Sequence, residues 1–105
     1  MHASIWKLDG DSDELARRYD ALLAELGPAR IEMQLCLRAR DGLVIVDTCP
    51  TEEAFRGFIA SPDFAAMLER HGLPELSSID DYPVHTAIAG GEIVAGVSVL
   101  TPHIV

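Results

Sequence analysis

The sequence is poor in cysteine, in basic residues and in long apolar runs, and each shortage excludes a class of protein. Two cysteines, Cys36 and Cys49, are too few for a disulfide scaffold and lack the spacing of metal ligands. Eight basic residues against 17 acidic ones give a formal net charge of -9, which repels nucleic-acid phosphates and anionic lipid. No apolar run is long enough to span a bilayer. We therefore expect neither a nucleic-acid partner nor a membrane partner.

A chain of 105 residues suffices for one domain with one hydrophobic core and is too short for two. Hydrophobic residues make up 49% and charged residues 24%, which is the balance of a globular protein rather than of a disordered one. The first residues contain no basic segment followed by an apolar stretch, which argues against a signal peptide. We therefore expect a globular, cytoplasmic protein.

Apolar periodicity predicts four strands and two helical regions. Leucines at helical spacing, closed by Gly27, predict the clearest helix at 13–26. A second helical region begins after Thr51 and is interrupted and restarted at Ser61-Pro62. β-Forming residues between turn signals predict strands at 2–8, 30–40, 43–49 and 82–89. The segment 74–81 before the last strand is expected to be irregular.

Asp41 and Gly42 predict a tight hairpin between the second and third strands, because a type I′ turn needs positive φ at both central residues. With these two residues as the loop, Arg40 pairs with Leu43, and alternation assigns the two faces. The face expected to be core carries Ile31, Met33, Leu35, Leu37, Ala39, Val44, Val46 and Thr48. The opposite, mixed polar face carries Glu32, Gln34, Cys36, Arg38, Ile45, Asp47 and Cys49. The two cysteines are then diagonal neighbours, and we expect two free thiols.

The order β-α-β-β-α-β predicts an α+β, ferredoxin-like fold over residues 1–89, in which helices cover one face of a four-stranded antiparallel sheet. A domain this small gains by covering the second face of its sheet. Two copies paired sheet to sheet in a two-fold homodimer would cover it. Residues 90–105 form an apolar C-terminal tail, which is open to two interpretations: a further strand, or a segment exchanged between subunits.

Three stretches of the sequence carry a resemblance to a known superfamily, namely 47–49 (DTC), 51–55 (TEEAF) and 61–64 (SPDF). They are similar to the matching region of the dimeric α/β-barrel superfamily, which includes antibiotic-biosynthesis monooxygenases, polyketide cyclases and stress-responsive barrel proteins. The resemblance implies sheets paired in a dimeric α/β barrel. It also implies a small-molecule pocket between the sheet and the helices of each subunit.

The chain departs from the monooxygenase branch of this superfamily at two of the matching positions. Cys49 stands where that branch usually has tryptophan, and Phe58 stands where histidine is common. The chain also lacks asparagine altogether, a residue used by cofactor-free quinone-forming oxygenases and by haem-degrading relatives. The resemblance therefore implies the fold and the pocket rather than either of these reactions.

The resemblance places His2 where a strand histidine acts as acid or base in barrel-type polyketide cyclases, and imidazole suits that role because its pKa lies near neutrality. Tyr19 and His71, on the inner faces of the two helical regions, are placed to share its cavity and to polarise a phenol or carbonyl group. The structural alternatives are a packed core tyrosine and a histidine that ends a helix. The expected pocket lining comprises Trp6, Leu35, Val46, Thr48, Phe55, Phe58, Phe64, Met67 and His85.

Glu32, Cys36, Arg38, Asp47 and Cys49 form a polar cluster on the face expected to meet the partner subunit. The favoured interpretation is an interfacial charge network that fixes the register of the dimer. The alternative is an activated thiol, since Arg38 would lower the pKa of Cys36, whereas Asp47 would raise it. The four histidines show no HxH or ExxH spacing, so we expect no dedicated metal site.

Two hypotheses of function follow. The first is a homodimeric barrel that binds a small apolar or aromatic molecule and acts, without a cofactor, as a cyclase-type or monooxygenase-type enzyme through acid/base catalysis by the three candidate residues. The second is a non-catalytic ligand-binding or stress-response barrel whose pocket is filled by its own aromatic side chains and Met67. A closed cavity favours the second hypothesis, and an open cavity containing His2 or His71 favours the first.

Overall fold

The structure is a computed structural model and describes residues 1–96, apart from the side chain of Arg30. Its elements in chain order are β1 (His2–Asp9), α1 (Ser12–Leu26), the short 3-10 helix η1 (Pro28–Arg30), β2 (Gln34–Ala39), β3 (Gly42–Cys49), α2 (Glu52–Ala60), α3 (Pro62–Arg70), β4 (Ser78–Pro83), β5 (Ala87–Ala89) and β6 (Glu92–Ala95). Within this part of the chain, no helix is long and apolar enough to cross a membrane.

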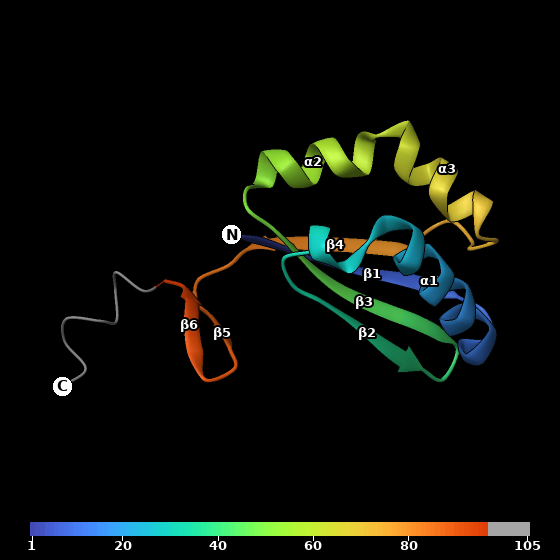
Figure 1. Cartoon of the computed structure of the whole chain (residues 1–105), viewed down its shortest axis with the longest axis horizontal. Coiled ribbons are helices and arrows are strands. Elements are labelled where there is room, and N and C mark those ends of the chain that lie inside the picture. Colours follow the sequence, from blue (N-terminus) through green and yellow to red (C-terminus); the bar gives the residue numbers. More distant parts are fainter. Residues whose placement is uncertain (97–105) are drawn as a thin grey trace.

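β1 to β4 form one antiparallel sheet in the order β2-β3-β1-β4. The three α-helices lie on one side of this sheet (Figure 1), with α2 and α3 in the place of a single second helix. This is the ferredoxin-like α+β fold that the element order predicts. β5 and β6 form a separate hairpin beyond the end of the sheet (Figure 1).

Side-chain caps set the boundaries of the helices. Asp11, Thr51 and Ser61 each accept a hydrogen bond from a backbone N–H two or three residues further on, at the starts of α1, α2 and α3. Gly27 ends α1 with a φ of 86°, in the left-handed region that favours glycine. The break at Ser61 therefore leaves α3 with a capped N-terminus of its own.

The core lies between the helices and the sheet face on which β1 presents His2, Ser4, Trp6 and Leu8. These four side chains are buried, whereas Ile5 on the opposite face is 40% exposed. The other buried apolar residues of the main cluster are Leu15, Tyr19, Leu22, Leu43, Ile45, Phe64, Leu68 and Leu73. Removing these side chains from water provides most of the favourable free energy of folding.

The prediction of which hairpin face meets the helices is wrong. Ile45, which pairs with Trp6, and Asp47 are buried beneath the helices, whereas Leu35 and Leu37 are 56% and 47% exposed. Pairing with β1 decides the face, because residues directly opposite one another in an antiparallel pair point to the same side. β1 turns Trp6 toward the helices, so its partners on β3 follow. The more apolar face of β2 and β3 is therefore the uncovered one.

The register of the hairpin also differs from the predicted one by two residues. The turn is 40–41, so Ala39 pairs with Gly42. Gly42 belongs to β3 because its backbone passes very close to β1: a Cβ at this position would lie 1.9 Å from the carbonyl oxygen of Leu8. The shift moves the two cysteines further apart along the strands, and both are free.

The last strand of the sheet begins earlier than predicted. β4 starts at Ser78, inside the segment expected to be irregular, and forms an edge of the sheet, which is where a strand tolerates Pro83. His85 lies exposed between β4 and β5. β5 pairs with β6, so the start of the predicted tail forms a hairpin. Exchange of the tail between subunits stays a prediction, and residues 97–105 lie outside the described part of the chain.

Candidate functional site

A small cavity of about 40 Å³ lies between the helices and the sheet. Tyr19 and Gln34 are the polar residues of its lining. The remaining lining residues are Trp6, Leu8, Leu22, Leu23, Leu26, Ile45, Phe58, Phe64, Met67, Leu68 and Leu73. This position is the one in which the resemblance to dimeric barrels implies a small-molecule pocket.

Three aromatic rings pack together along the cavity. Phe64 meets Trp6 edge to face with ring centroids 5.3 Å apart, and Phe58 lies 4.5 Å from Phe64 and 6.0 Å from Trp6. These separations are those of favourable aromatic pairs. The indole N–H of Trp6 donates to the hydroxyl of Ser4 at 2.8 Å, which satisfies a buried donor and fixes the ring from the sheet side. The cavity therefore has a wall suited to a flat apolar molecule.

The polar groups of the cavity belong to one hydrogen-bonded chain, the Tyr19–Gln34–Asp47 chain. The Tyr19 hydroxyl of α1 donates to Oε1 of Gln34, and Nε2 of Gln34 donates to Oδ1 of Asp47 at 3.1 Å. Asp47 is 8% exposed and lies opposite Ser4 of β1. Two hydrogen bonds thus link the Tyr19 phenol and the Gln34 amide, which line the cavity, to the buried carboxylate of Asp47.

Burial shifts the pKa values of both ionisable residues of the Tyr19–Gln34–Asp47 chain. It raises the pKa of Tyr19 to about 12, with a smaller contribution from negative charge on neighbours including Asp47. Burial also raises the pKa of Asp47, although hydrogen bonds from Gln34 and from the backbone of Thr48 act in the opposite direction. A buried carboxyl with a raised pKa beside a cavity is a candidate for proton transfer.

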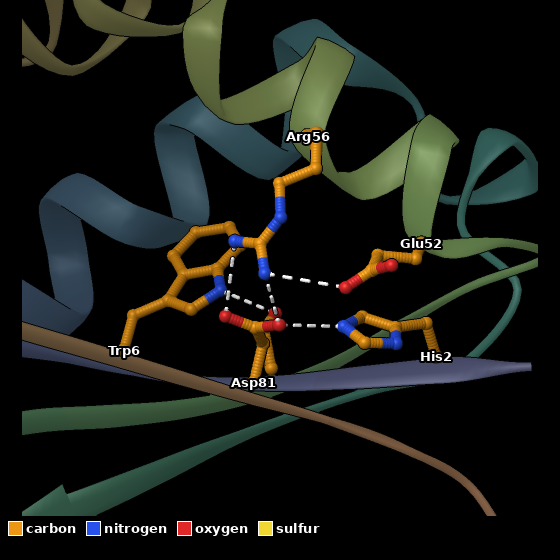
Figure 2. A network of polar contacts seen from close by, with 6 residues as sticks. His2, Trp6, Glu52, Arg56 and Asp81 are labelled. Atoms are coloured by element: carbon orange, nitrogen blue, oxygen red, sulfur yellow. Dashed lines mark hydrogen bonds and ion pairs between the residues drawn. The ribbon is translucent and has the colours of Figure 1, made fainter.

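A second polar group, the His2 network, consists of His2, Glu52, Arg56 and Asp81. Nε2 of His2 lies 2.7 Å from Oδ1 of Asp81, and Arg56 donates to both Asp81 oxygens at 2.8 and 3.1 Å. Arg56 also lies 3.4 Å from Glu52, so its guanidinium joins the two carboxylates (Figure 2). The hydrogen bond from His2, and then those from Arg56, lower the pKa of Asp81. The network ties β1, α2 and β4 together.

The His2 network borders an open hollow of about 340 Å³, whose lining includes Met1, His2, Pro50 and Glu52. Ligand atoms of His2, Glu52 and Asp81 all lie within 4.8 Å of one another. The His2 ring packs 5.5 Å from the ring of Phe55, which is fully buried. Imidazole and carboxylate groups brought together in this way are suited to proton transfer or to metal binding.

The structure does not bring the three predicted catalytic residues into one cavity. Tyr19 lines the cavity, whereas His2 belongs to the network at the other hollow. His71 follows α3 as its C-cap. Its Nε2 atom is buried 3.5 Å from a carboxylate oxygen of Glu25 and forms no hydrogen bond within the described residues. His71 therefore occupies the helix-terminal position that was the structural alternative.

The predicted pocket lining is partly displaced by the change of hairpin face. Leu35, Val46 and Thr48 lie on the uncovered side of the sheet, and His85 lies beyond the end of β4. Phe55 is buried but packs against His2 rather than along the cavity. The predicted lining residues that do border the cavity are Trp6, Phe58, Phe64 and Met67.

The predicted dimer-face polar cluster lies on the helix side of the sheet or at its edge. Asp47 is buried there, and both cysteines are half-buried. Arg38 forms an ion pair with Asp13 of α1, and Glu32 is exposed. Burial raises the pKa values of Cys36 and Cys49, which is the opposite of thiol activation.

The sequence reasoning missed Gln34, Glu52, Arg56 and Asp81 as site residues. Glu52 and Arg56 have the i,i+4 spacing that places two side chains on one side of a helix, and this signal could have linked them. Gln34 was correctly grouped with Asp47, but on the wrong side of the sheet. Asp81 was assigned to an irregular connector, so no pattern in the sequence joined it to a residue 79 positions earlier.

Comparison with known proteins identifies the fold. No protein-family model matches the sequence, and no curated protein does. Among solved structures, a proposed antibiotic biosynthesis monooxygenase from Deinococcus radiodurans is 19% identical, with a TM-score of 0.58 over 85% of this chain and 97% of that one. A proposed antibiotic biosynthesis monooxygenase from Chloroflexus aurantiacus is 13% identical, with a TM-score of 0.57 over 85% and 96%.

A third solved structure, the cofactor-independent oxygenase SnoaB from Streptomyces nogalater, is 17% identical, with a TM-score of 0.55 over 83% of this chain and 93% of that one. The chain therefore has the ferredoxin-like fold of the antibiotic biosynthesis monooxygenase-like proteins, and the predicted resemblance is confirmed at the level of the fold. At these identities the likeness extends to architecture and not to reaction.

Proposed function

We propose that this chain binds a small, largely apolar or aromatic molecule between its helices and its sheet. The observation that carries the proposal is the cavity, which is lined by three aromatic rings and by Tyr19 and Gln34, the two residues that lead by hydrogen bonds to Asp47. Ligand pockets are characteristically apolar, with a few placed polar groups that orient the ligand. A hydroxyl or carbonyl group on the ligand would bond to Tyr19 or Gln34 while its apolar part packs against Phe58 and Phe64.

The cavity has to enlarge to hold such a molecule. Its volume of about 40 Å³ accommodates at most a few waters, whereas ligand pockets measure roughly 300–1,000 Å³. The unliganded core is thus filled by its own side chains. Met67 is half-buried on the lining, and its unbranched side chain adapts easily to a new shape. Ligand entry would therefore begin with movement of Met67.

Calorimetric titration with 1-naphthol, a flat aromatic phenol, tests this proposal. We expect saturable binding by the unmodified chain and tighter binding by Met67→Ala, which enlarges the cavity. Leu23→Phe, which fills it, should weaken binding by about tenfold, since overpacking costs roughly 1–3 kcal/mol. Ala24→Phe places the same ring at the next, exposed position of α1 and should leave affinity unchanged.

Two results would contradict ligand binding at this cavity. One is the absence of a binding heat for both the unmodified chain and Met67→Ala. The other is an equal loss of affinity in Leu23→Phe and Ala24→Phe, which would place the naphthol on the surface of α1.

We propose as a second candidate function that the bound molecule undergoes cofactor-independent acid/base chemistry. The favouring observation is Asp47, a buried carboxyl with a raised pKa that reaches the cavity through Gln34. Burial of this kind prepares a carboxyl for proton exchange nearer to neutral pH. SnoaB, of similar fold, is a cofactor-independent oxygenase, so chemistry without a cofactor has a precedent on this fold.

We also propose that two copies of the chain form a homodimer through the uncovered sheet face. Ile5, Leu35 and Leu37 are 40%, 56% and 47% exposed on this face, with Val44 and Val46 half-buried beside them. An apolar sheet face of this kind gains free energy when a second copy covers it. The sheet-to-sheet arrangement is the one predicted from the sequence, but the apolar face replaces the polar one at the interface.

A further inference from the structure

His2, Glu52 and Asp81 come from β1, α2 and β4, and the fold brings one ligand atom of each within 4.8 Å of the others. None of these residues lines the helix–sheet cavity. His2 is 5% exposed and Asp81 is 18% exposed, so two of the three groups are largely removed from water. Such a position strengthens electrostatic interactions with any bound cation.

We propose that His2, Glu52 and Asp81 bind one divalent cation of the borderline class, for which Zn²⁺ is the best fit. One imidazole nitrogen and two carboxylate oxygens are ligands that Zn²⁺ accepts, and three protein ligands leave at least one coordination position open. The site is separate from the ligand-binding cavity proposed above and stands independently of it.

The distances in the network suit this cation after small movements of its side chains. Zn²⁺ binds nitrogen and oxygen ligands at about 2.0–2.2 Å, so ligand atoms around it lie no more than about 4 Å apart. Nε2 of His2 and Oδ1 of Asp81 are 2.7 Å apart and would separate slightly as bonds to the ion replace their hydrogen bond, and the widest separation among the three ligand atoms is within 4.8 Å. The Glu52 side chain is 62% exposed in the first turn of α2, so it can close the remaining distance without disturbing the core.

The open coordination position would face the hollow of about 340 Å³ that His2 and Glu52 line. The hollow has room for water or for a small molecule that donates an oxygen ligand. The buried ring of Phe55 packs 5.5 Å from the ring of His2 and gives the site an apolar neighbour. The arrangement of three protein ligands beside an open position is that of catalytic rather than structural zinc sites.

Arg56 is the group with which the cation would compete. Its guanidinium pairs with Asp81 and Glu52, so one positive charge is shared by two carboxylates. A divalent cation would neutralise both. Arg56 is 57% exposed, and its long side chain can turn into solvent when the cation enters. Removing the guanidinium should therefore strengthen cation binding, whereas in a purely structural ion-pair network it would only weaken the fold.

Calorimetric titration of Zn²⁺ alone into the untagged, chelator-treated full chain tests this proposal. We expect one equivalent to bind. Glu52→Gln should weaken binding by about tenfold or more, since even residues that only support metal ligands contribute roughly 10–100-fold. Glu53→Gln removes the same charge from the adjacent residue, which is outside the cluster, and should leave affinity unchanged. Arg56→Gln should bind Zn²⁺ several-fold more tightly than the unmodified chain.

The expected ranking of the variants separates a metal site from adventitious binding. Glu52 and Glu53 are both exposed, so neither substitution threatens folding, and a thermal unfolding scan of each variant verifies this. Binding that is absent, or that is equal in Glu52→Gln and Glu53→Gln, would overturn the proposal. Weaker binding by Arg56→Gln than by the unmodified chain would overturn it as well.

Discussion

At the scale of single residues, Asp47 combines burial, hydrogen bonding and proximity to the cavity. It is 8% exposed and accepts a hydrogen bond from Gln34. The desolvation of its charged form exceeds the benefit of that hydrogen bond, so the pKa of Asp47 is raised. A group with a raised pKa in the folded state binds protons more strongly there than in the unfolded state. Its ionisation therefore opposes folding.

Replacement of Asp47 by asparagine should consequently stabilise the protein at neutral pH. The amide side chain would be uncharged and would still accept the Gln34 hydrogen bond, so we expect a gain on the order of 1 kcal/mol in the free energy of unfolding. The sign follows from proton linkage: the unmodified chain loses stability as pH rises from the unfolded pKa, about 3.9, through the raised folded pKa. The gain should therefore grow in urea unfolding as pH rises above about 4, and it should level off once pH has passed the raised folded pKa.

The matched control is Asp80→Asn, which removes one negative charge at an exposed position of β4. A pH-independent difference between Asp47→Asn and the unmodified chain would contradict a raised pKa at Asp47. The same pair of variants examines the acid/base function. Any turnover of a ligand should be lost in Asp47→Asn and retained in Asp80→Asn.

At the scale of secondary-structure elements, the β2–β3 hairpin decides which side chains meet the helices. Its alternation is visible in the sequence, but the covered face is set by pairing with β1, where Trp6 and Ile45 are opposite one another. Its turn is set by Gly42, whose backbone lies against the Leu8 carbonyl oxygen. The Asp-Gly pair predicts the hairpin correctly and predicts its register wrongly, because the close approach of a third strand outweighs the local turn preference.

The substitution Gly42→Ala should therefore be severely destabilising. Its Cβ would lie 1.9 Å from the Leu8 carbonyl oxygen, so β1 and β3 would have to separate locally, at a cost of about 3 kcal/mol or more. Gly57→Ala is the matched control, because a Cβ at this position of α2 meets nothing within 4 Å. It should instead stabilise the helix by about 0.5–1 kcal/mol.

Urea unfolding at constant pH measures both changes through the midpoint and the slope. A loss of less than about 1 kcal/mol in Gly42→Ala would mean that the strands tolerate a side chain at this contact. The register derived above would then need revision.

At the scale of the whole molecule, the sheet has one face covered by helices and one face exposed. The exposed face is the more apolar side of β2 and β3, on which Leu35 and Leu37 are about half exposed. A stable homodimer requires an extended, complementary apolar surface on each copy, because a two-fold interface uses the same patch twice. The uncovered sheet face provides the apolar surface that such an interface needs.

Light scattering should give the unmodified chain a mass near twice 11.4 kDa. Leu37→Glu should dissociate the dimer, with affinity on the order of 100-fold weaker, since an unpaired charge buried at an interface costs about 3 kcal/mol or more. Ala66→Glu, at an exposed position of α3, adds the same charge on the helix side and should leave the dimer intact. A monomeric unmodified chain at every concentration would rule out the sheet-to-sheet dimer.

The sequence by itself determined the first strand, the helices, the central hairpin and their order, whereas it misplaced the last strand of the sheet. Helix caps, the glycine after α1, the proline restart at Ser61 and the alternation of β1 are local signals, because each acts between residues a few positions apart. They were sufficient to predict the ferredoxin-like fold and to place Tyr19, Trp6, Phe58 and Phe64 on inward-facing surfaces.

Only the tertiary structure decided which face of the hairpin is buried and which polar groups meet. Pairing with β1 placed Asp47 under the helices and left Leu35 exposed. The fold also joined His2 to Asp81, across 79 positions of the chain. Local periodicity has the same form for either face of a strand and contains no information about residues so far apart. The buried face of the hairpin was therefore decided by strand register, and the contact between His2 and Asp81 by long-range packing.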